Sequence, residues 1–483
     1  MTPPPVTSRT AWASLWAMVI GFFMILVDTT IVSVAMPAMM RGLGADYTQV
    51  LWVNSAYLLT YAIPLLITGR LGDKFGPRTV YLSGLVVFTL TSLWCALAGS
   101  IGSLILARAI QGLGASMMTP QTMAVITRTF PADRRGKAMS LWGATAGVAM
   151  LVGPLAGGVL VDAGGWEWIF FINVPVGILG FVLGFAFIPR LPSNDHHRFD
   201  LVGVALSAVG MFCLIFGLQE GQTYSWGHIV GPISVPLLIG AGIVILGLFV
   251  LWQRHTFSEP LVPLTLFRDR NFSLGNLAIA SVGISITTVA FPLMLYAQNV
   301  RGFTPTQAAM LMIPQAILSG ALAPVAGILV DRVAPRRLAP FGLFTAAGSL
   351  LWLAIALSGT TPIWLLLLTL GLFGVGNAFL WSPLSVTAIR RLPLTAAGAG
   401  SGVYNTTRQV GSVLGSAALA ALMNWRIQAA APGMSTQSTA VPAELAGQYT
   451  AAMAQTLLLP IAGLLLAGVI AMFFVGHPRT DRV

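Results

Sequence analysis

Apolar runs of about 20 residues recur along the whole chain, and short polar or charged breaks separate them. Runs of that length cross the hydrocarbon core of a bilayer when they form α-helices. They lack the alternation of every second residue that a membrane barrel strand requires. The breaks predict fourteen spans, near residues 12–36, 50–69, 80–99, 103–127, 138–161, 168–189, 201–219, 230–252, 273–297, 306–330, 338–358, 361–385, 400–423 and 452–475. The pattern therefore predicts an all-α polytopic membrane protein.

Composition agrees with this class. Of the 483 residues, 56% are hydrophobic and only 8% are charged, whereas a soluble domain carries about 25% charged residues. The two cysteines fall in apolar spans without metal-ligand spacing, and no nucleophile–base pair stands out. Neither an enzyme nor a bound cofactor or metal is expected.

The net charge of +11 follows membrane topology. Of the 25 Lys and Arg residues, 20 lie in the termini and the even-numbered loops, and only Arg41, Arg301 and Arg426 lie in the odd-numbered ones. Arg108 and Arg408 fall inside or at the edge of spans. This asymmetry is the positive-inside pattern, so both termini are expected in the cytoplasm. Insertion topology explains the basic residues, and no nucleic-acid partner is expected.

Two loops repeat one another. The stretch "GRLGDKFGPR" (69–78) follows the second span, and "GILVDRVAPR" (327–336) follows the tenth, with five identities at a constant offset of 258 residues. That offset covers eight helices, so two extra spans separate two six-helix halves, an arrangement typical of transporters. The predicted parts are a cytoplasmic N-terminus (1–11), an N-terminal six-helix bundle (12–190), two additional helices (201–252), a C-terminal bundle (273–475) and a cytoplasmic C-terminus (476–483).

The repeated loops each contain an acid and an arginine, Asp73 and Arg78 in the first and Asp331 and Arg336 in the second. A carboxylate can cap the positive N-terminus of a neighbouring helix, and nearby arginines can pair with it. Such contacts would form only when the two halves close at the cytoplasmic face. These four residues are gating candidates; the alternative is that they only set topology.

Several motifs carry a family resemblance. The first loop resembles the signature of the major facilitator superfamily at Gly69, Leu71, Asp73, Gly76 and Arg78. "LILARAIQGLGAS" (104–116) is similar to its fourth-span motif, and "GVAMLVGPLAGG" (147–158) to its antiporter motif, ending in Gly153, Pro154, Gly157 and Gly158. "LVDTTIVSVAMP" (26–37), "WIFFINVPVG" (168–177) and "SGVYNTTRQVGSVLG" (401–415) resemble the fourteen-span drug:proton antiporter branch. The resemblance implies the major facilitator fold, with two six-helix bundles and two extra helices, and multidrug efflux from a bacterial plasma membrane.

Asp28 is the candidate for coupling to protons. Only two lysines are present, Lys74 and Lys137, and neither lies in an ATP-binding motif, so an ion gradient is the expected energy source. A charge in mid-helix costs about 2.5–3.5 kcal/mol on insertion scales and is functional by default. Burial favours the neutral acid and a nearby cation favours the carboxylate, so Arg108 is expected to modulate Asp28. The alternative is a static Asp28–Arg108 ion pair that only holds helices together.

A single acid well inside a span predicts one coupled proton per cycle and poor transport of dications. Polar and aromatic residues in the spans suit an amphipathic organic substrate, because a mostly apolar cavity with a few polar groups is typical of such sites. The candidates for this cavity are Asn54, Tyr57, Tyr61, Gln111, Phe291, Tyr296, Gln298, Asn377, Trp381, Tyr404 and Asn405. For each aromatic residue taken singly, packing or lipid contact is the stronger interpretation.

The expected function is proton-coupled export of amphipathic or lipophilic compounds such as drugs, dyes and antibiotics. The alternative is export or flipping of one endogenous product, for example a lipid, a siderophore or a self-made antibiotic. A sensor without transport ranks lower. The expected partners are a small organic substrate, protons and the lipid bilayer, and the protein is expected to be a monomer.

Overall fold

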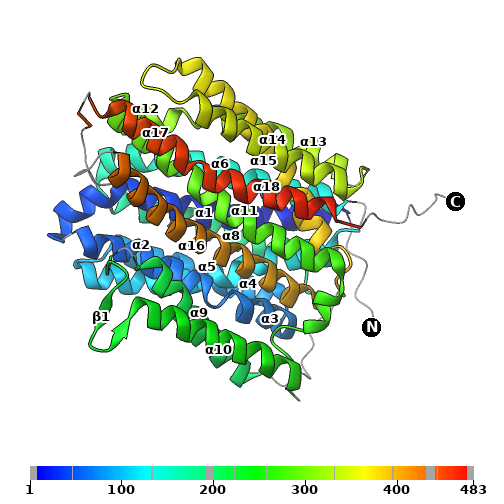
Figure 1. Cartoon of the computed structure of the whole chain (residues 1–483). Helices are drawn as coiled ribbons and strands as arrows, with labels where there is room; N and C mark the ends of the chain where they lie inside the picture. Colours follow the sequence, from blue (N-terminus) through cyan, green and yellow to red (C-terminus); the bar gives the residue numbers. More distant parts are fainter. Residues whose placement is uncertain are drawn as a thin grey trace, which may run out of the picture. The chain divides into compact units, whose positions relative to one another are not determined.

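The structure is a computed structural model that describes residues 8–45, 47–131, 134–191, 200–221, 223–256, 259–330, 332–393, 396–430, 441–442 and 444–475 (Figure 1). Its helices are α1 (Ser8–Leu43), α2 (Tyr47–Ala62), α3 (Leu65–Phe75), α4 (Pro77–Ala96), α5 (Ile101–Thr129), α6 (Arg135–Gly164), α7 (Trp168–Phe171), α8 (Asn173–Phe187), α9 (Leu201–Gln219), α10 (Val235–His255), η1 (Leu264–Arg268), α11 (Arg270–Leu295), η2 (Tyr296–Val300), α12 (Pro305–Met310), α13 (Ile313–Val330), α14 (Pro335–Ala356), α15 (Ile363–Ile389), α16 (Ala397–Ala430), α17 (Ala446–Thr456) and α18 (Leu458–Met472).

Membrane-spanning helices make up most of the described chain. Twelve helical segments there are long and apolar enough to cross a bilayer, and two bent pairs bring the number to fourteen if each pair is one span. All fourteen predicted spans overlap one of these segments or pairs. The prediction of an all-α polytopic membrane protein is confirmed.

The second predicted span is bent. Its two parts, α2 and α3, meet at 47° around Pro64. Proline has no backbone N–H, so it cannot donate the helical hydrogen bond to the carbonyl four residues earlier, and its ring clashes there. The bend redirects α3, which contains Asp73 near its end.

A short hairpin precedes α10, which the apolar pattern did not predict. Strands β1 (His228–Val230) and β2 (Ile233–Ser234) pair antiparallel, and Gly231 adopts φ +54° in the turn. The eighth span was predicted to begin near residue 230. The helix begins instead at Val235, where the Ser234 hydroxyl accepts a hydrogen bond from the Leu237 N–H. A side-chain oxygen at that position satisfies a donor that the first helical turn leaves free.

The two additional helices, α9 and α10, lie side by side (Figure 1). Asp200 joins the start of α9 to the end of α10, because its carboxylate accepts hydrogen bonds from the Gly203 N–H, Trp252 Nε1 at 2.8 Å and Gln253 Nε2 at 2.6 Å. One buried acid therefore both caps α9 and fixes its neighbour.

The chain forms two compact units. Unit 1 comprises Met1–Gly217, Gly227–Leu266 and Ile389–Thr406, and unit 2 comprises Leu218–Trp226, Phe267–Ala388 and Thr407–Val483. Unit 1 thus includes α9 up to Gly217, all of α10 and also the first turns of α16. The domain boundaries expected from the sequence stay a prediction.

Each unit has its own apolar core. In unit 1, α1 packs on α6 through a stacked ring pair, Phe22 and Trp142, with centroids 4.6 Å apart. In unit 2, α18 packs against α11 and α14. The packing in unit 1 surrounds the polar site described next.

Candidate functional site

Asp28 lies in the middle of α1 with no exposed surface, and Arg108 of α5, also fully buried, is its ionic partner. Arg108 Nη1 donates to Asp28 Oδ2 at 2.5 Å. The two charges come from segments 80 residues apart, and the packing of α1 against α5 brings them together. An oppositely charged partner offsets part of the cost of removing each ion from water.

Two amides complete the shell around Asp28. Gln111 Nε2 donates to Asp28 Oδ1 at 3.2 Å, and Asn173 Nδ2 of α8 donates to the same oxygen at 3.0 Å. Asn173 also donates to Ser92 Oγ of α4 at 3.0 Å, and Ser92 in turn donates to the Phe170 carbonyl. Side chains from four helices of unit 1 (α1, α4, α5 and α8) therefore form one hydrogen-bonded network around a single carboxylate.

Arg108 is held on several sides. Its Nε donates to the Val53 carbonyl at 3.2 Å, its Nη1 donates to Gln111 Oε1 at 2.8 Å, and its guanidinium carbon lies 4.1 Å from the centroid of the Tyr57 ring. Its Nη2 has no hydrogen-bond partner among the described residues. A guanidinium stays protonated in proteins, so Arg108 remains a cation beside the Asp28 carboxylate.

Asn173 and Ser92 are functional candidates that the sequence interpretation missed. Asn173 stands in the quoted stretch "WIFFINVPVG", and an amide in so apolar a run was a usable signal. Ser92 had none, because serine is common in membrane helices. Gln111 was predicted for the substrate cavity, which stays a prediction, and the structure shows it in this network, bonded to both ions.

A second cluster surrounds Asp73 at the end of α3. Its carboxylate accepts hydrogen bonds from Arg128 Nη2 at 2.5 Å and from the backbone N–H groups of Gly398 and Ala399, at 2.9 and 2.8 Å, in the first turn of α16. Arg70 Nη1 lies 3.8 Å from the same carboxylate. Asp73 thus caps a helix N-terminus, as the sequence suggested, and its charged neighbours are Arg128 and Arg70.

Close backbone packing accompanies that cap. A Cβ atom at Gly69 would lie 2.5 Å from the Gly398 carbonyl oxygen and 3.0 Å from the Cα atom of Gly402. Only glycine leaves room for α3 and α16 to approach this closely. The loop signature therefore combines a small residue for contact with an acid for the cap.

The other gating candidates lie elsewhere. Arg78 Nη2 donates to the Phe185 carbonyl of α8 at 2.6 Å, so Arg78 contacts α8. Among the described residues, no hydrogen bond or ion pair joins it to Asp73. Arg336 is exposed at the start of α14. Asp331 lies outside the described residues. The structure therefore describes the acid-capped helix N-terminus for the first loop alone.

Six of the predicted cavity residues belong to unit 1. Tyr57 and Tyr61 are buried in α2 with stacked rings, and the Tyr61 hydroxyl lies 3.2 Å from Thr119 Oγ1. Asn54 is partly buried in the same helix. Tyr404 and Asn405 are fully buried in α16, and Gln111 belongs to the Asp28 network. Tyr57 contacts Arg108, which connects this group to the charged pair.

The remaining five belong to unit 2. Trp381 Nε1 donates to Asn377 Oδ1 at 2.8 Å, which makes these two residues of α15 one polar pair. Tyr296 and Gln298 lie in η2, a π-helical turn, and the buried Tyr296 hydroxyl donates to the Ser358 carbonyl at 2.6 Å. Phe291 is 51% exposed on α11. π-Helical turns within longer helices are frequent at functional sites.

The antiporter motif lies on α6, which packs on α1. A Cβ atom at Gly153 would collide with Thr30 Oγ1, and one at Gly157 would lie 2.9 Å from Ile31 Cγ1. These glycines therefore allow close contact two or three residues from Asp28. Gly158 faces open space, so close packing does not explain it, and Pro154 lies inside the helix.

Buried, paired acids inside bundles of membrane helices are typical of ion or substrate pathways. The fold and this site together define a membrane transporter. The family model of the Major Facilitator Superfamily matches residues 18–416. The chain belongs to this superfamily, and it is a transporter and not an enzyme.

Curated relatives extend the match. The uncharacterized MFS-type transporter Rv1250 of Mycobacterium tuberculosis (strain ATCC 25618 / H37Rv) is 49% identical over 477 residues, which cover 97% of this chain and 81% of that protein. The tetracenomycin C resistance and export protein of Streptomyces glaucescens is 32% identical over 438 residues, 88% of this chain and 78% of that protein. These names are consistent with the drug-efflux branch that the motifs predicted.

A solved structure shares the fold. The proton:xylose symporter XylE superposes with a TM-score of 0.66 at 14% sequence identity, and the match covers 96% of this chain and 95% of that one. At this identity the likeness shows the fold alone. The predicted major facilitator fold is confirmed.

Proposed function

We propose that this transporter exports amphipathic organic compounds in exchange for protons, by alternating access in a bacterial plasma membrane. The observation that carries the proposal is the fully buried Asp28 carboxylate with its shell of Arg108, Gln111 and Asn173. Export, as opposed to uptake, is supported by the relative named for resistance and export.

The proton step rests on the chemistry of the shell. All three neighbours donate hydrogen bonds to Asp28, and Arg108 is its counter-ion. Neutral Asp28 would instead leave the Arg108 charge without a counter-ion in an apolar bundle. A rearrangement that separates α5 from α1 would remove the main donor and let Asp28 take a proton. Proton uptake and helix movement are therefore coupled, and the proton needs no bound cofactor.

The gate step rests on Asp73. While its carboxylate caps α16 and binds Arg128, the start of α16 is held against α3. Alternating access requires that this cap be broken once per cycle. We place this contact at the cytoplasmic face, because the arginine asymmetry puts the loop between the second and third spans, and both termini, on that side.

The substrate side is supported by aromatic and amide residues. Tyr57 lies against Arg108 in unit 1, and Trp381 with Asn377 forms a polar aromatic pair in unit 2. Ring faces attract organic cations, and amides bind polar groups of larger compounds. The proposed substrate is therefore a lipophilic molecule with few polar groups, and the protein is proposed to act as a monomer.

Dye efflux tests the proposal. Cells that express wild type or Asp28→Asn at equal membrane levels are loaded with a lipophilic cationic dye, and efflux is followed with and without a proton uncoupler. We expect efflux by wild type to stop with the uncoupler, and Asp28→Asn to be inactive in both conditions. Equal efflux by both proteins, insensitive to the uncoupler, would refute proton coupling through Asp28.

A further inference from the structure

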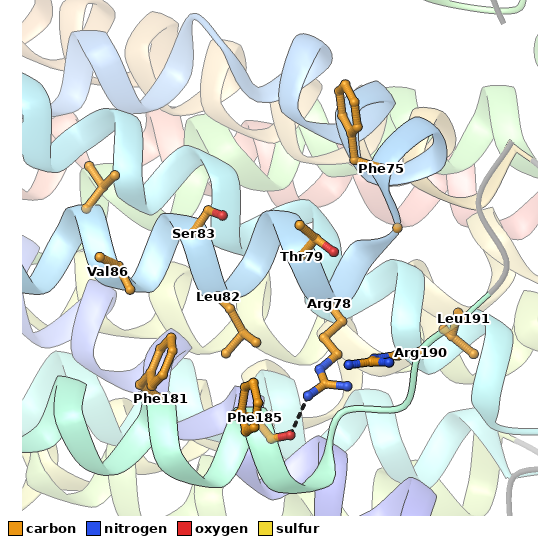
Figure 2. A pocket seen from close by; sticks show the side chains of 12 residues that line it. Phe75, Arg78, Thr79, Leu82, Ser83, Val86, Phe181, Phe185, Arg190 and Leu191 are labelled. Carbon is orange, nitrogen blue, oxygen red and sulfur yellow. Dashed lines mark hydrogen bonds between the residues drawn. The ribbon is translucent and has the colours of Figure 1, made fainter. Parts of the chain in front are cut away.

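A groove runs between α4 and α8 on unit 1, with a volume of about 720 Å³ (Figure 2). Both helices are parts of candidate membrane spans, Pro77–Ala96 and Trp168–Phe187. Arg78 lies in the first turn of α4, and Arg190 follows the last turn of α8. The charged end of the groove therefore lies beside the first turn of one span and the last turn of the other. Nothing in the transport proposal uses this groove.

Two guanidinium groups face each other at that end. Figure 2 shows the Arg78 and Arg190 side chains adjacent to one another, with Arg78 donating to the Phe185 carbonyl. Neither arginine forms an ion pair with a carboxylate among the described residues. Each guanidinium has five N–H donors, so most donors of the pair remain available for an anion. Like charges this close also repel, and a bound anion would relieve that repulsion.

The rest of the groove is mostly apolar, and its polar side chains are the hydroxyls of Thr79 and Ser83 on α4. On α4, Leu82 and Val86 follow Arg78 at intervals of four residues, and on α8, Phe185 and Phe181 form the facing wall. Val86, Phe181 and Phe185 are 39%, 36% and 59% exposed. Eight helical residues from Arg78 to Val86 rise about 12 Å. A charged end followed by an apolar surface two helical turns long, the apolar lane of the groove, matches the size and chemistry of a lipid headgroup and the first part of its acyl chain.

We propose that this groove binds an anionic phospholipid, with the phosphate between Arg78 and Arg190 and an acyl chain along Leu82, Val86, Phe181 and Phe185. Guanidinium pairs bind phosphate by bidentate, charge-assisted hydrogen bonds. Basic pockets between membrane helices at the cytoplasmic side are where such lipids bind. A free phosphate ion would leave the apolar wall unused. The proposal requires only that α4 and α8 lie in the membrane, and it does not depend on proton coupling.

The test is lipid binding to the purified full-length protein in detergent, by native mass spectrometry with phosphatidylglycerol, with phosphatidylcholine of the same acyl chains, and with inorganic phosphate. Arg190→Gln is the main variant, because Arg78 is also a gating candidate. Arg254→Gln is the matched control, an exposed arginine at the end of α10. Val86→Trp, at an exposed position, fills the apolar lane without changing charge.

We expect phosphatidylglycerol to bind wild type and the Arg254→Gln control equally, and Arg190→Gln about fivefold more weakly, the effect of one arginine near a lipid phosphate. Val86→Trp should also bind phosphatidylglycerol more weakly, and phosphatidylcholine should bind every protein weakly. Equal binding of the two lipids, or unchanged binding in both Arg190→Gln and Val86→Trp, would overturn the proposal. Inorganic phosphate that competes with phosphatidylglycerol at equal concentration would reassign the groove to a free-phosphate site and equally overturn it.

Discussion

Replacing Asp28 by asparagine separates the structural from the coupling role of the buried pair. Asparagine keeps the shape of the side chain and one acceptor oxygen, which can still bind the amides of Gln111 and Asn173. It removes the negative charge opposite Arg108, whose side chain has no exposed surface. A carboxylate that loses its partner can neutralise itself with a proton, but a guanidinium has no such route.

The loss of folding stability in each variant follows from this difference between the carboxylate and the guanidinium. Removing one partner of a buried ion pair destabilises a protein by about 3–5 kcal/mol, because the remaining charge is left uncompensated. We expect Asp28→Asn to lie in that range and Arg108→Gln to cost less. In the double variant no charge remains, so it should recover most of the stability that Asp28→Asn loses, to within about 2 kcal/mol of wild type.

Unfolding of the four proteins in lipid bicelles measures these differences, and efflux in liposomes measures coupling. The matched control is Asp162→Asn, an exposed acid near the end of α6, which should change neither stability nor efflux. The double variant should be stable yet inactive, because it has no group to carry the proton. A double variant as unstable as Asp28→Asn, or Asp28→Asn as stable as wild type, would refute the uncompensated-charge reasoning.

Four further outcomes follow from the site. Asn173→Leu removes a donor to Asp28 and should slow efflux at least tenfold in liposomes without preventing folding; unchanged rates would remove it from the network. Asp73→Asn should weaken the α16 cap by about 2 kcal/mol, which lengthens the distance between spin labels on α3 and α16; an unchanged distance would contradict the gate. Gly153→Val should block close packing of α6 on α1 and abolish efflux, whereas Gly158→Ala, in open space, should remain active; loss of efflux in both would contradict this. Proton and substrate fluxes from purified protein should give one proton per cycle, and a ratio of two or more would contradict a single titrating acid.

The apolar pattern predicted the architecture well because the bilayer imposes one simple rule. Every spanning segment must be apolar and about 20 residues long, so the fourteen spans could be found from hydropathy alone. The ends were less accurate. After His228, the hairpin before α10 consists of apolar and small residues that resemble the start of a span, and only backbone pairing distinguishes the two.

The candidate site was predictable in part. Asp28 and Arg108 could be found because an ionisable residue in a span is costly and rare. The partners of Asp73 could not be found in this way. Arg128 lies 55 residues from Asp73 and Gly398 lies 325 residues from it, and no local sequence pattern indicates these contacts. Arg78 was predicted for the gate from its place in the repeated loop, and in the structure its side chain contacts α8.

The sequence by itself determined which charged residues lie within apolar spans and are therefore costly in a bilayer. That cost depends only on the residue type and on its depth along one helix. Tertiary structure alone decided what each such residue meets. In the folded protein, Asp28 contacts two amides, Asp73 contacts a helix N-terminus, and Arg78 lies beside a second arginine. The physical reason is that ion pairs and hydrogen bonds act over a few ångströms between different helices, and the order of residues along one chain does not record those distances.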